Sequence, residues 1–341
     1  MWETSSKTIF QYVIMHYWIA RAILTSRCYF AAMGGVALCM SSVVSGAAVS
    51  NAELANAELP AAIYTDPPAD PAHPASGKGV QFQSHGVLIN AQIYRPAGEG
   101  AHPTVVLLHG LPGNEQNLDL AQAMRRSGWT VISFHYRGSW GSGGTYSLKN
   151  GIEDTRALLA LLSEPATARS WGVDSSRIVL VGHSYGGYVA ARAAVDAPAL
   201  LGVVLIAPWD ISFDRRAWAP LTPARRLSVG LAAFDDVDGR LTGATAASLI
   251  DEVMHEGAQF DLSKLAARLA GRKLLIVTAT RDDDDDKAIG LLSSLEHEHA
   301  EHVTAEIMDT DHGFNDHRIA LQAAVVRWLT SLTGASMSGA R

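Results

Sequence analysis

Short apolar runs alternate with amphipathic stretches over most of this chain. Thr104–Leu108 and Thr130–Phe134 are rich in β-branched and large apolar residues, too short for helices and typical of buried parallel strands. Later runs of the same kind are Ile178–Val181, Leu201–Ile206, Lys273–Thr278 and His302–Met308. Between the runs, apolar residues recur at helical spacing, as over Ile152–Leu162, Lys287–Glu298 and Asn315–Leu332. Repeated strand–helix units predict an α/β fold, with a mainly parallel sheet and helices on both faces.

Two stretches depart from this alternation. Val80–Phe82 and Val87–Tyr94 alternate apolar and polar residues, which predicts an antiparallel pair of strands at the start of the sheet. Ala207–Leu269 contains three prolines, short helical patterns and no convincing strand, and it predicts a helical cap inserted over the sheet. The predicted organisation is therefore a core of residues 78–206 and 270–334, with a cap insertion at 207–269.

Composition narrows the classes of partner. The chain has 341 residues, of which 48% are hydrophobic, and a net charge of −7 with no basic stripe, so we expect no nucleic acid partner. Both cysteines, Cys28 and Cys39, lie near the N-terminus. The predicted core therefore has no disulfide framework, no cysteine-ligated zinc and no thiol nucleophile.

The N-terminal residues have the pattern of a targeting segment. Arg21 and Arg27 precede an apolar stretch from Tyr29 to Val44, and small residues follow it. We read residues 1–58 as a signal peptide or leader with a flexible start, and expect export to the periplasm or medium after cleavage. A retained membrane anchor and a cytosolic protein are the alternatives. Residues 59–77, rich in Pro, Ala and Asp, are predicted to be a linker.

The strongest chemical signal is a serine between a strand pattern and a helix pattern. Gly182-His183-Ser184-Tyr185-Gly186 follows the apolar run Ile178–Val181 and precedes an alanine-rich helical stretch. This G-x-S-x-G sequence predicts a sharp strand-to-helix turn that exposes the hydroxyl of Ser184. The two glycines lack the Cβ atoms that would collide in so tight a turn.

A serine hydroxyl needs a base within hydrogen-bond reach and a carboxylate to orient that base. Asp282 follows the next-to-last predicted strand and His312 follows the last, so both lie at the carboxyl ends of strands, as Ser184 does. Asp282 is therefore the candidate acid, with Asp283 and Asp210 as alternatives. His312 is the candidate base.

Two other histidines lie near this pattern. His317 follows His312 by about one helical turn and is the alternative base. His183 precedes the serine directly, but a sharp turn directs neighbouring side chains elsewhere, so we interpret it as a packing residue.

The oxyanion that forms on acyl transfer needs backbone donors placed in advance. The N–H of Tyr185 opens the predicted helix after the serine and is one candidate. The N–H of Leu111, in the loop after Thr104–Leu108, is the other. Four aromatic residues are candidates for an apolar substrate pocket, with core packing as the alternative for each: Trp140, Trp209, Phe213 and Trp218.

Three further features resemble cofactor or ligand sites, but their patterns favour other interpretations. The glycine-rich stretch 138–144 lacks the register of a dinucleotide-binding loop. The cluster at Glu296–His302 is interpreted as a solvated helix end, and the arginine pairs at 215–216 and 225–226 as surface charge. We therefore expect no cofactor and no metal.

These residues resemble the α/β-hydrolase superfamily over about Val80 to Leu332. Within it, Ser184-Tyr185-Gly186-Gly187-Tyr188 and Tyr136-Arg137-Gly138-Ser139 are similar to the catalytic domain of the prolyl oligopeptidase (S9) family. Few residues precede the first predicted strand, so we expect neither that family's propeller nor the gate by which it selects short peptides. The resemblance implies an α/β-hydrolase fold and a Ser184–Asp282–His312 triad acting through an acyl-enzyme.

The predicted function is a serine hydrolase that cleaves a carboxylic ester of a small to medium substrate. A serine aminopeptidase or amidase acting on short peptides is the alternative within the same chemistry. A non-catalytic binding protein with this fold is the alternative from another class. Dehalogenase chemistry is disfavoured because the turn carries Ser184 where an aspartate would be required. A membrane partner is expected only if the N-terminal segment is retained as an anchor.

Overall fold

The structure is a computed structural model that describes residues 59–282 and 285–334. Within these ranges no helix has the length and apolar character needed to span a bilayer. The predicted leader at residues 1–58 lies outside the described residues, as does the alternative acid Asp283. Export and signal cleavage therefore stay predictions.

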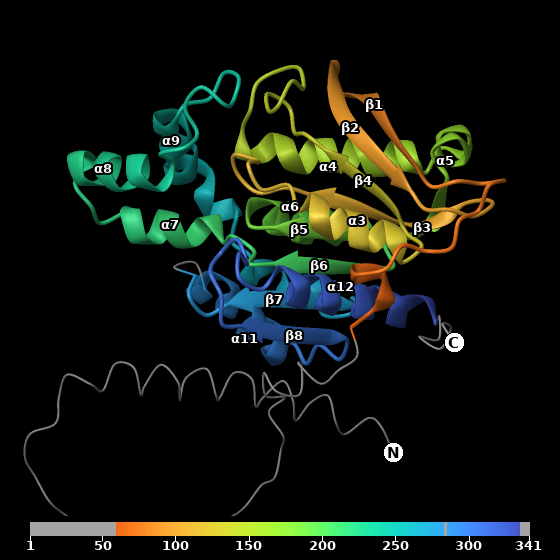
Figure 1. Ribbon diagram of the computed structural model, residues 1–341. Coiled ribbons are helices and arrows are strands. Elements are labelled where there is room, and N and C mark those ends of the chain that lie inside the picture. The colour runs from red at the N-terminus through yellow and green to blue at the C-terminus, as the bar shows by residue number, and fades with distance from the viewer. Residues whose placement is uncertain (1–58, 283–284, 335–341) are drawn as a thin grey trace, which may run out of the picture. The chain divides into compact units, whose positions relative to one another are not determined.

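The core is one eight-stranded sheet with the order β1-β2-β4-β3-β5-β6-β7-β8 (Figure 1). Strand β1 pairs antiparallel with β2, and β2 antiparallel with β4, while the other neighbours are parallel. This confirms the predicted α/β-hydrolase fold and the antiparallel opening. The strands are β1 (Ser76–Ser84), β2 (Val87–Arg95), β3 (His102–Leu108), β4 (Thr130–Phe134), β5 (Val173–His183), β6 (Gly202–Ile206), β7 (Leu274–Ala279) and β8 (Val303–Met308).

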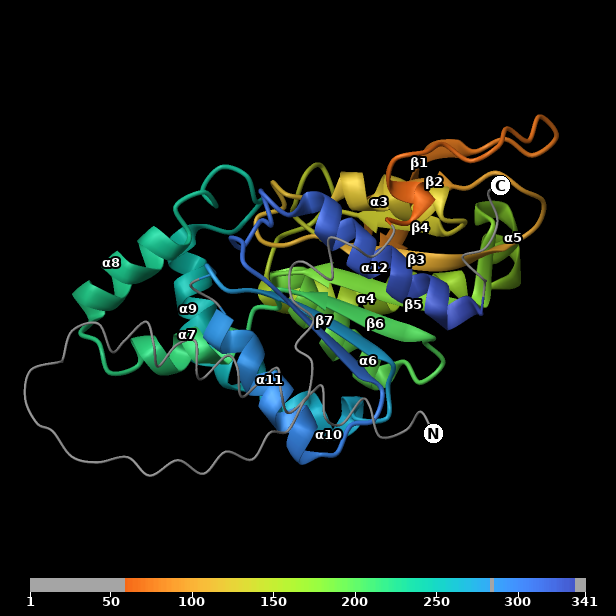
Figure 2. The same cartoon turned by 60° about the horizontal axis from the view of Figure 1, so that its bottom comes forward.

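Helices cover both faces of the sheet (Figure 2). Helices α3 and α12 pack on one face, where Met124, Leu321 and Trp328 join the strand residues in a single apolar core. Helices α4 and α6 pack on the other face. The α-helices are α3 (Leu118–Arg126), α4 (Leu148–Leu162), α5 (Pro165–Trp171), α6 (Tyr185–Asp196), α7 (Ile211–Trp218), α8 (Pro223–Ala233), α9 (Ala246–Glu256), α10 (Ala266–Leu269), α11 (Asp285–His297) and α12 (Arg318–Thr333), and the short 3-10 turns are η2 (Ala61–Ile63), η3 (Gly257–Gln259) and η4 (Ser263–Leu265).

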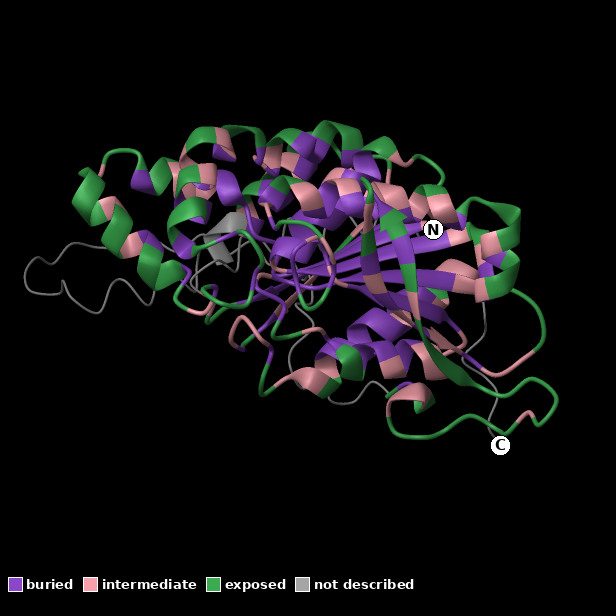
Figure 3. Cartoon of the chain, turned by 90° about the horizontal axis from the view of Figure 1, so that it is seen from above, coloured by how far each residue is buried: buried purple, intermediate pink, exposed green. Residues whose placement is uncertain are grey.

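Most residues of the central strands are buried (Figure 3). All residues of β4, β6 and β7 are buried, because helices cover both of their faces. These strands have continuous apolar sequences because both of their faces are covered. Helix α5 was not predicted from the sequence; Pro165 starts it and Gly172, in the left-handed conformation, ends it.

The segment between β6 and β7 carries helices α7 to α10, and α7 to α9 lie beyond the carboxyl ends of the parallel strands (Figure 1). Backbone bonds tie this segment to the loop after β4. Leu241 forms a β-bridge with Ser139, the amide of Thr242 donates to the Gly138 oxygen at 2.7 Å, and the Thr242 oxygen accepts from the Tyr146 amide at 2.9 Å. The predicted cap, whose exact limits stay a prediction, thus contains helices fixed against the edge where the candidate residues lie.

The segment predicted as a linker contains ordered contacts. Turn η2 lies against α3 and α12, and the Arg126 guanidinium donates to the backbone oxygens of Ala62 at 2.5 Å and Ile63 at 3.3 Å. Strand β1 begins at Ser76, two residues before the predicted start of the core. The sequence missed both features because the segment has no periodic apolar pattern.

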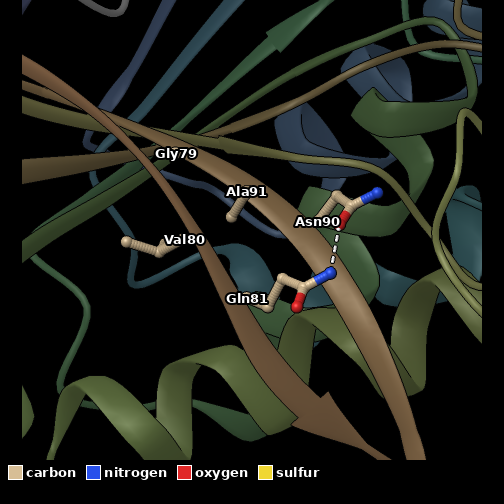
Figure 4. Close-up of a pocket in the computed structure, with 5 residues that line it drawn as sticks. All are labelled: Gly79, Val80, Gln81, Asn90 and Ala91. Atoms are coloured by element: carbon tan, nitrogen blue, oxygen red, sulfur yellow. Dashed lines mark hydrogen bonds between the residues drawn. The ribbon is translucent and has the colours of Figure 1, made fainter.

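The opening hairpin carries a shallow groove (Figure 4). It is lined by Gly79, Val80, Gln81, Asn90 and Ala91 on β1 and β2, and Gln81 donates to the Asn90 side-chain oxygen at 2.8 Å. None of the candidate catalytic side chains lines this groove.

Candidate active site

Ser184 occupies a strained turn between β5 and α6. Strand β5 ends at His183 and α6 begins at Tyr185, so the turn is a single residue with φ 55° and ψ −121°. A positive φ costs a non-glycine residue about 1–3 kcal/mol and persists only where surrounding contacts enforce it. Here the Ser184 amide donates to the Ile206 oxygen at 2.9 Å, and the Ser184 oxygen accepts from the amides of Gly187 at 2.9 Å and Trp209 at 3.0 Å.

The two glycines of the motif are required by close backbone approaches. A Cβ at residue 182 would lie 2.0 Å from the Gly186 oxygen, and one at residue 186 would lie 2.2 Å from the Leu108 oxygen. No side chain fits at such distances because both neighbours are backbone atoms. The turn therefore holds the chain tightly between β3 and β6 and leaves Ser184 partly exposed.

Asp282 and His312 form a hydrogen-bonded pair. The His312 Nδ1 lies 2.6 Å from the Asp282 Oδ2. The Asp282 side chain is only 6% exposed, whereas that of His312 is 37% exposed. When Asp282 is ionised and His312 is neutral, this contact places the histidine proton on Nδ1, because an ionised carboxylate only accepts hydrogen bonds, and Nε2 then keeps its lone pair. This is the tautomer that a general base needs.

The loop that carries His312 lies against the end of β5. The ring of His183 is 4.9 Å from the ring of His312, centroid to centroid, and its Nε2 donates to the His312 backbone oxygen at 2.9 Å. His183 directly precedes Ser184, so the structure brings the histidine and serine segments to the same edge of the sheet. His183, which we interpreted as packing only, therefore also bonds the histidine's backbone.

Two of the alternative candidates, Asp210 and His317, contact other groups. Asp210 caps α7, where its Oδ1 accepts from the Ser212 amide at 3.0 Å and hydroxyl at 2.7 Å. His317 lies at the start of α12 with its Nδ1 3.0 Å from the Asp316 Oδ1. Among the described residues, the Asp282 carboxylate lies within hydrogen-bond distance of His312.

The loop after β3 passes over Ser184. A Cβ built on Gly110 would lie 3.1 Å from the Ser184 Cβ and 3.6 Å from its Oγ, so the backbone at Gly110 is near the hydroxyl. Leu111 is the next residue. On the other side of Ser184, Tyr185 is the first residue of α6, where an N–H has no acceptor within the helix.

Two aromatic side chains in the loop after β4 form hydrogen bonds with the loop after β3. The Tyr136 hydroxyl donates to the His109 oxygen at 3.0 Å, and the Trp140 Nε1 donates to the Pro112 oxygen at 2.7 Å. Gly113 allows the approach, because a Cβ there would lie 2.6 Å from the Trp140 Nε1. Trp140, 40% exposed, is therefore the candidate pocket residue beside the Leu111 loop.

The other candidate pocket residues pack within the predicted cap. Trp209 is buried, donates from Nε1 to the Asp214 Oδ2 at 2.5 Å, and lies edge-on to Tyr185 at 6.4 Å. Phe234 contacts both Trp209 and Trp218, with centroid distances of 6.0 and 6.1 Å. Phe213 is partly exposed, and the Arg216 guanidinium carbon lies 5.9 Å above its ring. Trp209 and Trp218 thus belong to an aromatic cluster that sequence reasoning did not connect to Phe234.

A buried ion pair that the sequence analysis missed supports the loop after β4. Asp154 on α4 is fully buried and accepts from the Ser84 hydroxyl at 2.6 Å, the Arg137 amide at 2.8 Å and the Arg137 Nε at 2.7 Å. Burial raises the pKa of Asp154, and the bonds from Arg137 and Ser84 act against that rise. The sequence signal that could have indicated this ion pair is an aspartate on the apolar face of a predicted helix, where a carboxylate requires a partner.

Two buried histidines near the turn are held neutral. Burial lowers the pKa of His109 to about 4 and that of His183 to about 3. The Nδ1 of His183 is buried and has no hydrogen-bond partner among the described residues, so protonation there would place an unpaired charge in the core. Within the described ranges, no three histidine, cysteine or acidic side chains are grouped so that they could hold a metal ion.

These histidines predict a loss of stability in mild acid. An unfolded histidine has a pKa of about 6.5, so below that pH the unfolded chain binds protons that the folded chain excludes. The stabilisation is complete above pH 6.5 and falls as the pH drops toward the folded value. We expect His183→Asn to make the free energy of unfolding less pH-dependent, by about 1 kcal/mol between pH 6 and 5. Urea unfolding of both proteins at the two pH values measures the difference, and equal slopes would contradict a neutral buried imidazole.

The chain matches the model of the alpha/beta hydrolase family over residues 105–325. It is 34% identical over 180 residues to the quorum-quenching protein AidA of Acinetobacter baumannii, covering 50% of this chain and 56% of that protein. An uncharacterized protein of Mycobacterium tuberculosis is 29% identical over 160 residues, covering 46% of this chain and 55% of its own length. The chain thus spans about half the length of the curated relatives it matches.

Solved structures share the fold. A hyperthermophilic esterase from the archaeon Pyrobaculum calidifontis superposes with a TM-score of 0.55 at 20% identity, over 77% of this chain and 88% of the esterase. Brefeldin A esterase, a bacterial homologue of human hormone-sensitive lipase, gives 0.54 at 20% identity, over 81% and 80% of the two chains. At such identities the likeness concerns the fold alone. The family model matches residues 105–325, which are more than half of this chain, so the chain belongs to the alpha/beta hydrolase family.

Proposed function

We propose that this chain is a serine hydrolase that cleaves carboxylic esters of small to medium size. The observation that carries the proposal is the 2.6 Å bond from buried Asp282 to His312, on a loop that lies against the strained turn at Ser184. A base oriented by a buried carboxylate beside an exposed hydroxyl is the arrangement that activates a serine. The esterase structures share the fold and make ester hydrolysis the first reaction to test.

The proposed mechanism assigns a role to each of these groups. The Nε2 of His312 takes the hydroxyl proton as the Ser184 Oγ attacks the ester carbonyl carbon. The carbonyl oxygen becomes an oxyanion, which the N–H groups of Leu111 and Tyr185 stabilise. His312 returns the proton to the leaving alcohol, and an acyl-enzyme remains. Water, deprotonated by His312, then attacks the acyl carbon, and the carboxylic acid leaves as Ser184 regains its proton.

Asp282 keeps its charge through this cycle. It accepts from the Nδ1–H of His312 and thereby stabilises the imidazolium that exists while the oxyanion is present. No step of this reaction requires a cofactor. The groups involved come from loops after β3, β5, β7 and β8, at the carboxyl edge where α/β proteins bind ligands.

The aromatic residues near the site are the candidate substrate contacts. Trp140 is partly exposed beside the Leu111 loop, so we propose that it contacts the acyl or alcohol part of the ester. Trp209 and Trp218 are buried and would act through the shape of the cap instead. Because the Acinetobacter relative is named a quorum-quenching protein, a substrate panel should include bacterial signalling molecules with ester or lactone groups.

A serine aminopeptidase or amidase is the second candidate. It is favoured by Ser184-Tyr185-Gly186-Gly187-Tyr188, the motif that is similar to the S9 family. The same triad would attack an amide carbonyl, and only the leaving group would differ. Short peptides would then be the substrates.

Covalent labelling combined with paired substrates tests these proposals. A fluorophosphonate probe should label the wild-type protein at Ser184, as located by peptide mass spectrometry. Hydrolysis of p-nitrophenyl esters should exceed that of matched p-nitroanilides. Exclusive anilide cleavage would favour the amidase, and absence of labelling would favour a non-catalytic binding protein.

A further inference from the structure

Two loops of the site follow strands that are not neighbours in the sheet. The oxyanion loop (residues 109–117) follows β3 and the histidine loop (residues 309–317) follows β8. In the sheet β5, β6 and β7 lie between these strands, so no strand pairing holds the two loops at a fixed separation. Their separation would still decide whether the base and the oxyanion donors act on the same carbonyl group.

Arg318, the first residue of α12, bonds to both loops. Its Nη1 donates to the Gly313 oxygen in the histidine loop at 3.0 Å, and its Nη2 donates to the Asn117 side-chain oxygen in the oxyanion loop at 2.9 Å. It also forms a two-point bond with Asp119 on α3, from Nε to Oδ2 at 2.9 Å and from Nη2 to Oδ1 at 2.5 Å. The Arg318 side chain is 20% exposed, whereas that of Asp119 is 39% exposed.

The bonded residues are those that set each loop's path. Asn117 is buried with φ 55° and is the residue before α3, so its side chain fixes the point where the oxyanion loop enters the helix. Gly313 directly follows His312. The preceding carbonyl, that of His312, accepts from the His183 ring, so two consecutive carbonyls of the histidine loop are held by side-chain donors.

We propose that Arg318 is a positioning residue that sets the oxyanion loop and the histidine loop at the separation needed for acyl transfer. This inference rests on the proposed function. Arg318 contacts no reacting atom and acts through the two loops. A planar guanidinium spreads its donors over three nitrogens in fixed directions, whereas the three N–H donors of a lysine ammonium share one nitrogen and do not reproduce the fork that spans Asp119, Asn117 and Gly313. Displacements of about 1 Å at reacting groups cost about 100-fold in rate.

The test compares Arg318→Lys with a matched neighbour. Gln322→Met removes another donor to Asp119, a 2.9 Å bond from the next turn of α12, but leaves both loop contacts of Arg318 in place. We expect R318K to lower kcat for a p-nitrophenyl ester about 10- to 100-fold with KM changed less than about threefold. Q322M should keep kcat within about twofold. Circular dichroism melting shows that each variant is folded at the assay temperature.

A second variant separates positioning from loss of fold. Asp119→Asn weakens the two-point bond but leaves the Arg318 guanidinium and both of its loop partners in place. This variant replaces R318K in the kinetic comparison if R318K does not fold. If both residues act through the same contact, the double variant should lose about as much kcat as R318K alone. Additive losses would overturn the proposal, as would wild-type kcat in R318K or an equal loss in Q322M. Wild-type activity in Ser184→Ala would instead overturn the proposed function, so the two failures are distinguishable.

Discussion

Replacing Ser184 by alanine is expected to lower kcat for ester hydrolysis by about 10⁴-fold or more. Without the hydroxyl no acyl-enzyme forms, and only the oxyanion donors and substrate binding remain to accelerate attack by water. The fold should persist, because the bonds at residue 184 to Ile206, Gly187 and Trp209 use its backbone atoms. Alanine also tolerates the positive φ of the turn about as well as serine does. Steady-state kinetics on a p-nitrophenyl ester measures the loss.

Ser163→Ala is the matched control. Ser163 is exposed at the end of α4 and donates from its hydroxyl to the Leu159 oxygen, so its removal should leave kcat unchanged. Fluorophosphonate labelling should disappear in S184A and persist in S163A. Equal activity in S184A and the wild type would place the nucleophile elsewhere in the chain.

The sheet was predictable because its central strands have continuous apolar sequences. The runs at Thr104–Leu108 and Thr130–Phe134 coincide with the buried parts of β3 and β4, and the run at Lys273–Thr278 is offset by one residue from buried β7, Leu274–Ala279. Strand β5 is longer than its run: it begins at Val173, but residues 174–177 are polar and partly exposed, so they give no apolar signal. Local apolar content thus predicts where a strand is buried better than where it begins.

The predicted site was limited to what local motifs and chain order can indicate. The local G-x-S-x-G motif indicated the turn at Ser184, and positions after strands indicated Asp282 and His312. The contacts of Arg318 with Asp119 and Asn117 join residues about 200 positions apart, with no period or spacing to indicate them. Such polar pairs form only after the sheet has brought α3 and α12 together.

The aromatic residues of the cap were the least predictable. Composition indicates that Trp209 and Trp218 are apolar, but not which way each ring faces. In the structure both rings contact Phe234, and the Nε1 of Trp209 donates to Asp214. The direction of a side chain in a short helix depends on its neighbours in space, and the cap has no alternating pattern from which those neighbours could be read.

Replacing Asp282 by asparagine is expected to lower kcat by about 10⁴-fold while preserving the fold. The amide is similar in size to the carboxylate, but it carries no charge to stabilise the imidazolium. Its NH₂ group can also donate to Nδ1, which would move the histidine proton to Nε2 and remove the lone pair that accepts the serine proton. Loss of rate with KM nearly unchanged, measured on the same ester, is the expected signature.

Two aspartates serve as matched controls for this prediction. Asp210→Asn keeps a residue that caps helices well, so α7 should remain intact and kcat should stay within about threefold. Asp283→Asn changes the carboxylate next to Asp282 in the sequence and should likewise keep most of the activity. A 10⁴-fold loss in either control, with D282N active, would move the acid to that residue. Because His312 Nδ1 lies 2.6 Å from the Asp282 carboxylate, a charge elsewhere could orient the imidazole only after this bond had broken.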